Sequence, residues 1–106
     1  MSSSKSSVEA LVDALGPGAR TRAMMGEYVL YWRERVVGGV YDDRLLLKDV
    51  PATRQAHPDA PLEEPYPGAR AMRHLDLPRD EAEAQELIEV LEAMWEQVPA
   101  PRPRKR

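Results

Sequence analysis

The sequence predicts an α+β domain in which helices pack on an antiparallel sheet, forming two layers. Three observations lead to this fold class. Apolar residues recur at helical spacing near both ends, short runs of branched and aromatic residues fill positions 19–48, and very short polar turns separate those runs. Connections this short join neighbouring antiparallel strands. The expected element order is α-β-β-β-β-α-β-α.

The length of 106 residues gives room for one domain. The serine-rich stretch 1–7 and the stretch 99–106, where proline alternates with basic residues, are expected to be flexible tails around a domain at 8–98. The chain has no cysteine, which excludes disulfides and thiolate metal sites. No apolar run approaches the roughly 18 residues of a membrane span, and no signal peptide is recognised. A cytoplasmic protein without membrane contact is expected.

The first helix is predicted over residues 8–15. Its apolar residues recur with helical periodicity at Val8, Leu11, Val12 and Leu15. Ser6 or Ser7 can cap its start, because serine side chains accept hydrogen bonds from free helical N–H groups. The Gly-Pro-Gly run at 16–18 ends it.

Four strands are predicted to follow, at Thr21–Met25, Tyr28–Trp32, Val36–Tyr41 and Leu45–Leu47. The polar pairs Arg33-Glu34 and Asp42-Asp43 fit tight turns between them. Gly38-Gly39 lies inside the third strand. Two glycines at this place indicate a β-bulge or a close approach of another backbone segment.

The next segment predicts a short helix at Pro51–Ala56, capped by Asp49, with proline tolerated in its first turn. Residues 58–68 contain four prolines and are expected to form an extended loop. A short strand is predicted at Ala71–Leu75.

The final helix is the clearest element of the sequence. Asp80 and Glu83 have the spacing of a capping box, and Pro99 ends the helical pattern. Between them an apolar stripe at helical spacing comprises Leu87, Ile88, Leu91, Met94, Trp95 and Val98.

Three segments resemble the N-terminal domain of the TfoX/Sxy family of competence regulators. RAMMGEY at 22–28 is similar to the family's segment that leads into a hairpin, GGVYDDRLLLK at 38–48 to its second hairpin, and PYPGAR at 65–70 to its YPGAK loop. The residues that carry the resemblance are Arg22, Met24, Met25, Gly26, Tyr28, Gly39, Asp42, Asp43, Arg44, Tyr66 and Gly68.

This resemblance covers about residues 8–106 and implies the same antiparallel sheet with packed helices. It also implies a non-catalytic binding or regulatory module that acts through protein contacts, linked to competence or transcription. Members with the competence role carry a second, helical domain that has no counterpart in this sequence. The chain is therefore similar to stand-alone members. The family supplies no catalytic residues and no cofactor.

The residues themselves also favour a non-catalytic protein. His57 and His74 are the only histidines, and since neither has a partner at metal-ligand spacing, both are interpreted as surface residues. All serines lie within residues 2–7, so the domain offers no serine nucleophile. The adjacent acids Asp42 and Asp43 are expected to point apart into water. No metal or cofactor is expected.

A small enzyme stays a remote alternative. A deep pocket lined by Arg22, Glu27 and Asp43 would favour it.

The strands at Val29–Trp32 and Leu45–Leu47 are apolar without alternation, so both of their faces require cover. In one interpretation the first and last helices cover one face and the loop at 58–68 shields the other. In the second, an exposed apolar face binds a protein partner or a second copy, giving a homodimer.

The basic residues of the last stretch, Arg102, Arg104, Lys105 and Arg106, leave the rest of the chain with 11 basic and 18 acidic residues, a net charge of −7. General attraction to nucleic acid must therefore come from this stretch. It is interpreted either as a solubilising tail or as a weak, salt-sensitive contact to phosphates.

Overall fold

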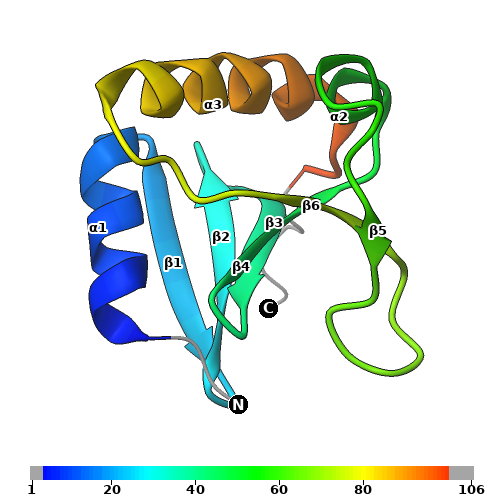
Figure 1. Cartoon of the computed structure of the whole chain (residues 1–106), viewed down its shortest axis with the longest axis horizontal. Coiled ribbons are helices and arrows are strands. Elements are labelled where there is room, and N and C mark those ends of the chain that lie inside the picture. Colours follow the sequence, from blue (N-terminus) through cyan, green and yellow to red (C-terminus); the bar gives the residue numbers. More distant parts are fainter. Residues whose placement is uncertain (1–3, 101–106) are drawn as a thin grey trace, which may run out of the picture.

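One antiparallel sheet of six strands organises the chain, as the short turns predict. A computed structural model describes residues 4–100 and gives the strand order β1-β2-β3-β4-β6-β5 (Figure 1). Every pairing is antiparallel, which confirms the α+β class. The strands are β1 (Ala19–Met24), β2 (Glu27–Trp32), β3 (Arg35–Tyr41), β4 (Arg44–Lys48), β5 (Leu62–Glu63) and β6 (Met72–Leu75).

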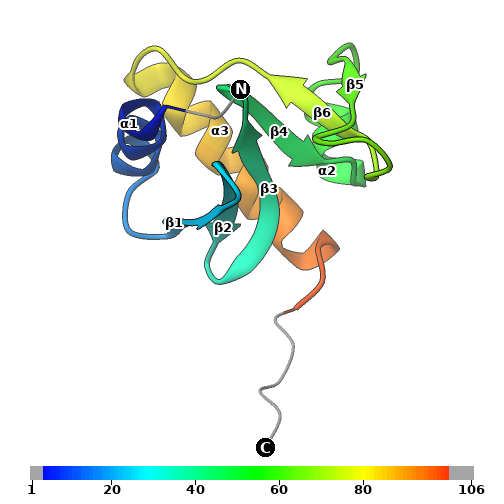
Figure 2. The same cartoon turned by 90° about the horizontal axis from the view of Figure 1, so that it is seen from below.

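Within residues 4–100, three helices accompany the sheet, in the predicted order. They are α1 (Lys5–Leu15), α2 (Pro51–Ala56) and α3 (Glu81–Met94), and a 3₁₀ turn at Trp95–Gln97 continues α3. In Figure 1, α3 runs across the top of the sheet and α1 stands on the side of β1. Figure 2 shows the same arrangement from below, with the sheet curling from β1 to β5.

The start of α1 differs from the prediction. The helix begins at Lys5 rather than Val8, so residues 5–7 belong to the domain and not to a tail. Ser4, rather than Ser6 or Ser7, is the N-cap, and its hydroxyl accepts a hydrogen bond from the Ser7 N–H at 3.4 Å. The run of serines offers several equivalent caps, and apolar periodicity alone could not choose among them.

The predicted loop at 58–68 contains an additional strand, β5, which pairs with Met72 and Arg73 of β6. A strand of two residues is too short to show the alternation of apolar and polar residues by which strands are recognised in a sequence. Asp49 was also expected to cap α2, but Val50 holds that position and the hydroxyl of Thr53 accepts the Val50 N–H at 3.0 Å. The Asp49 carboxylate instead faces two arginines.

The helix-facing side of the sheet carries the main core. Leu30 and Trp32 of β2 lie on this side with Val37 and Val40 of β3, Leu45 and Leu47 of β4, and Leu75 of β6. They pack in one cluster with α1 and α3, which contribute Val8, Leu11, Leu15, Leu87, Leu91 and Met94. The Trp32 indole N–H donates to Glu92 of α3 at 2.6 Å, so its polar atom is satisfied at the edge of the core.

Both predictions for Gly38-Gly39 are confirmed. The register between β2 and β3 shifts beside Leu30, which leaves one extra residue in β3 next to Gly38. A Cβ on Gly39 would lie 2.5 Å from the Tyr41 ring and 2.6 Å from the Tyr28 carbonyl oxygen. The glycines therefore permit the bulge and the packing of the Tyr41 ring against the strand.

The second face of the sheet is only partly covered. Leu46 is fully buried and Tyr41 is 8% exposed, although both lie opposite the helices. Tyr66 and Arg70 of the segment between β5 and β6 lie close enough to act electrostatically on Tyr41 and Lys48. The burial of Leu46 and Tyr41, with Tyr66 nearby, agrees with the interpretation in which this loop shields the second face at β4 and the end of β3, whereas β1 and β2 remain partly exposed.

Arg73 is the least expected polar residue of the interior. It is 9% exposed, and its Nε donates to Asp49 Oδ1 at 3.0 Å. Its Nη1 also donates to three carbonyl oxygens, at 3.2–3.4 Å, of His57, Pro58 and Ala60. One guanidinium therefore fixes the chain between α2 and β5 against β6.

We predict that Arg73→Leu lowers the free energy of unfolding by about 3 kcal/mol, because it leaves a partly buried carboxylate and three carbonyls without their donor. Urea denaturation measures the change. Arg70→Leu, an exposed arginine in the same segment of chain, is the matched control and should change stability little. An equal loss in both variants would contradict the role of Arg73.

The three hairpins from β1 to β4 share one kind of turn. The central pairs Met25-Gly26, Arg33-Glu34 and Asp42-Asp43 all have positive φ at both residues, as in type I′ turns. Five of these six residues are not glycine. Left-handed backbone is costly for most side chains, and least so for glycine, asparagine and aspartate.

We predict that Met25→Asn raises the free energy of unfolding by about 0.5 kcal/mol, since Asn-Gly is the preferred type I′ pair. The Met25 side chain is 99% exposed, so no packing is lost. Thermal and urea denaturation measure the gain. Met25→Val, a branched residue at the same φ of 52°, should destabilise the domain. A neutral or destabilising Met25→Asn would be inconsistent with strain in this turn.

Candidate functional site

Several residues that carry the family resemblance meet at one end of the sheet. The turns Met25-Gly26 and Asp42-Asp43 both lie at the lower end of the sheet in Figure 1. Glu27 Oε1 accepts the Asp42 N–H at 3.0 Å, and Asp43 Oδ1 accepts the Ser4 N–H at 2.7 Å. Asp42 and Asp43 are exposed. The Asp42 backbone and the Asp43 carboxylate connect two hairpins and the start of α1, and the two acids do not form a paired acid site.

The other motif residues divide between the two faces. Tyr28 is half-buried against the main core, while Gly39 lies beneath the Tyr41 ring. Burial, together with Tyr66 and Glu27, raises the pKa of Tyr41. Tyr66 is 57% exposed, and Gly68 has a φ of 87°, which glycine adopts without strain.

Arg44, Glu63 and His74 form a polar network on the second face. Arg44 pairs with one carboxylate oxygen of Glu63, and His74 Nδ1 lies 2.6 Å from the other. Arg44 Nε also donates to the Tyr41 carbonyl at 3.2 Å. The hydrogen bond from His74, followed by the charges of His74 and Arg44, lowers the pKa of Glu63.

This network corrects the prediction that both histidines are ordinary surface residues. His57 is exposed, as expected, but His74 is half-buried and bonded to Glu63. The three residues come from three different strands, so no local spacing could have predicted their contact. A carboxylate between an arginine and a histidine ties β4, β5 and β6 together.

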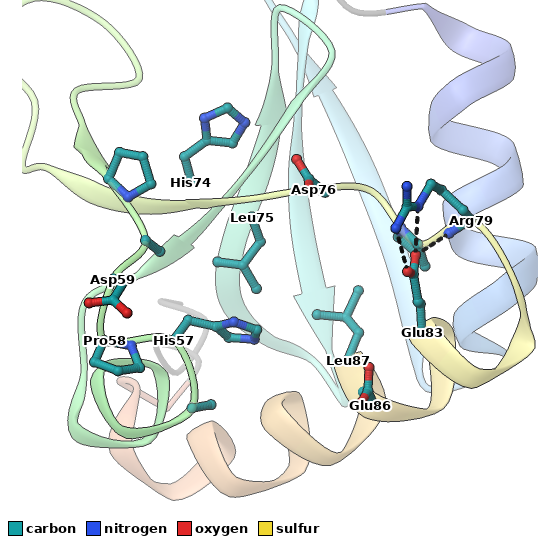
Figure 3. A pocket seen from close by; sticks show the side chains of 14 residues that line it. His57, Pro58, Asp59, His74, Leu75, Asp76, Arg79, Glu83, Glu86 and Leu87 are labelled. Carbon is teal, nitrogen blue, oxygen red and sulfur yellow. Dashed lines mark hydrogen bonds and ion pairs between the residues drawn. The ribbon is translucent and has the colours of Figure 1, made fainter.

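A groove with a volume of about 570 Å³ lies between the chain after α2, the end of β6 and the start of α3. Figure 3 shows His57, Leu75 and Leu87 pointing toward its centre, with the ion pair of Arg79 and Glu83 at one end. Asp59, Asp76 and Glu86 add negative charge to the lining. A second groove of about 490 Å³ continues from it between α2 and α3.

These grooves do not assemble the site that would favour an enzyme, because neither is lined by Arg22, Glu27 or Asp43. Among residues 4–100 the structure contains no cluster of three or more histidine or acidic side chains suited to a metal ion. Over the same residues, no helix has both the length and the apolar character needed to traverse a lipid bilayer. Arg102, Arg104, Lys105 and Arg106 lie outside the described residues.

The uncovered part of the second face is the remaining candidate, and we call it the open face. It consists of Arg20, Arg22 and Met24 of β1, Glu27, Val29 and Tyr31 of β2, and Val36 of β3, which the strand register places on one side. Its three central apolar residues are half-buried and Met24 is 48% exposed. The Arg20 guanidinium lies 3.9 Å from the Tyr31 ring centroid and pairs with Glu34 at 2.9 Å. Sequence reasoning found the apolar strands, but not which part of the face would stay uncovered.

We predict that Glu63→Gln destabilises the domain at pH 7 and that the difference from the unmodified chain shrinks in acid. Since the folded pKa of Glu63 lies below its ordinary value of 4.5, its stabilisation is complete above that pH and is lost as pH falls through the folded pKa. Urea denaturation between pH 7 and pH 3 measures both curves. Glu64→Gln, an exposed neighbour, is the control. A difference that does not change with pH would contradict this role.

Comparisons with known proteins give one informative relative. No family model and no solved structure match the chain. The chain is 42% identical over 98 residues to an uncharacterised 12.7 kDa protein in the trpE 5′ region of Spirochaeta aurantia. The match covers 90% of this chain and 83% of that protein. At this identity and coverage, the chain belongs to the family of the Spirochaeta aurantia protein.

Proposed function

We propose that the chain is a non-catalytic binding and regulatory module that acts through contact with another protein. The proposal follows the TfoX N-terminal domains that its motif segments resemble, including their link to competence or transcription. The observation that carries it is the open face, where apolar side chains remain accessible although the rest of the same sheet surface is covered by the chain's own loop.

The composition of the open face supports a protein contact. Val29, Tyr31 and Val36 form an apolar centre, and the ion pair of Arg20 and Glu34 lies at its rim. An apolar centre within a charged rim is typical of protein interfaces, where arginine, tyrosine and methionine are enriched. Two motif residues, Arg22 and Met24, lie on this surface, and Met25 lies in the adjoining turn.

The other polar groupings have structural explanations. The Arg44, Glu63 and His74 network joins three strands, and Arg73 fixes the chain before β5. Neither needs a substrate to account for its geometry. The open face, where Met24 is exposed beside the half-buried Val29, Tyr31 and Val36, has no such structural explanation.

Site-specific photo-cross-linking tests the proposal. A benzophenone amino acid replaces Met24 on the open face or, as a matched control, the exposed Gln85 of α3. In cells of the native host, position 24 should cross-link to a discrete protein and position 85 should not. The identified protein, once purified, should bind the unmodified chain in solution.

A cross-link between two copies would identify the partner as a second chain, in agreement with the proposal. Equal labelling from positions 24 and 85, or no specific adduct from position 24, would overturn it.

A further inference from the structure

The outer edge of β1 has backbone groups without partners in the sheet. β1 ends the strand order, so only β2 pairs with it. The Arg33 N–H donates to the Gly18 carbonyl at 2.8 Å, so Gly18 directs its backbone groups toward β2. In an antiparallel pair every second residue does so, and this contact therefore shows which residues of β1 face β2. Arg20, Arg22 and Met24 accordingly direct their backbone groups toward β2. Thr21 and Ala23 therefore direct their N–H and C=O groups outward.

The neighbouring helix does not close this edge. α1 covers the start of β1, where Ala19 is 6% exposed. Beyond it Thr21 is half-buried, and Arg22, Ala23 and Met24 are exposed. An unprotected edge of this kind is a template for another strand.

The charges on β1 disfavour a second copy as the strand that pairs there. If two β1 strands pair antiparallel through Thr21 and Ala23, Arg22 lies opposite Arg22 or Arg20 of the other copy in two of the three registers, and opposite Met24 when Ala23 faces Ala23. Like charges directly opposite each other destabilise a sheet. The arginines therefore disfavour self-pairing in those two registers and leave the edge open to a different strand.

The same charges select the chemistry of a partner. Arg20 is paired with Glu34, but the Arg22 side chain makes no hydrogen bond or ion pair with any residue from 4 to 100. Lys48 of β4 lies on the same side of the sheet, beyond the open face. Burial, followed by the charge of Arg70, lowers the pKa of Lys48. The acids on the open face and its rim are Glu27, which accepts the Asp42 N–H, and Glu34, which pairs with Arg20. Six other acids lie on α3 and its 3₁₀ turn, at Glu81, Glu83, Glu86, Glu89, Glu92 and Glu96.

We propose that β1 binds an extended protein segment as a seventh strand, and that this segment carries an acidic side chain at every second position. The inference rests on the proposed function and specifies its partner. Outward backbone groups of Thr21 and Ala23 would hold the segment, as in other cases of strand addition. Its acidic side chains would lie beside Arg22 and Arg20 on the open face, where opposite charges on adjacent strands stabilise the pairing.

A synthetic peptide provides the probe. Acetyl-Thr-Glu-Val-Glu-Val-Glu-Thr-amide has the required alternation, and the same peptide with lysine in place of glutamate is its control. NMR amide exchange on the full chain should show slowed exchange at Thr21 and Ala23 with the acidic peptide only. Binding should weaken as salt concentration rises. No protection at either amide, or equal protection by the lysine peptide, would overturn the inference.

Two variants test the backbone and the charge separately. Ala23→Pro removes one outward N–H without breaking the ladder to β2, because proline is tolerated at an edge strand. Arg22→Glu reverses the charge that is expected to attract the acidic segment. Arg70→Glu makes the same charge change away from β1. We expect the first two to weaken peptide binding at least about tenfold and the third to change it little. Thermal denaturation confirms that each variant is folded.

These variants also separate the inference from the proposed function. If Ala23→Pro and Arg22→Glu leave the cross-link from position 24 intact, strand addition is wrong although the chain still binds a protein through the open face. If both variants abolish that cross-link while Arg70→Glu retains it, strand addition is supported.

Discussion

Leu45, Leu46 and Leu47 are consecutive and fully buried, and this forces cover onto both faces of β4. Neighbouring residues of a strand point to opposite sides, so the helices can enclose Leu45 and Leu47 but not Leu46. The chain between α2 and β6 supplies the second layer. Arg73 anchors its first part on the helix side, and the network of Arg44, Glu63 and His74 anchors β5 on the other. The position of the open face follows, because this layer reaches β4 and the end of β3 and leaves β1 and β2 uncovered.

The elements that could be predicted from the sequence are those with local signals. The periodicity of apolar residues predicted α1 and α3, and glycines and polar pairs predicted the turns. The apolar run at 45–47 indicated a strand buried on both sides. The side chains of Arg73 and His74 could not be anticipated in the same way. Their partners lie 11–24 residues away and come together only when β6 pairs with β4. For the same reason the sequence predicted an uncovered apolar surface without locating it.

The structure divides the residues that carry the family resemblance into those with a structural role and those that are exposed on the open face. Gly39, Asp42, Asp43 and Arg44 have structural roles, in a close packing contact, a turn and a polar network. At these four positions the resemblance to the family is therefore explained by the structure of the hairpins. Arg22 and Met24 differ, since their side chains are exposed on the open face and support no neighbouring element with an ion pair or buried contact. The binding proposal depends on these two positions.

The three two-residue turns also bear on how the chain acquires its structure. The pairings among β1, β2, β3 and β4 all join strands that follow one another along the sequence, so each hairpin closes a very short loop at small entropic cost. The pairing of β4 with β6 must close a segment of more than twenty residues. We therefore expect the four-stranded meander to form first and β6 to dock in a later step. In pulse-labelled hydrogen exchange, amides of β2 and β3 would acquire protection before those of β6, and simultaneous protection would exclude this order.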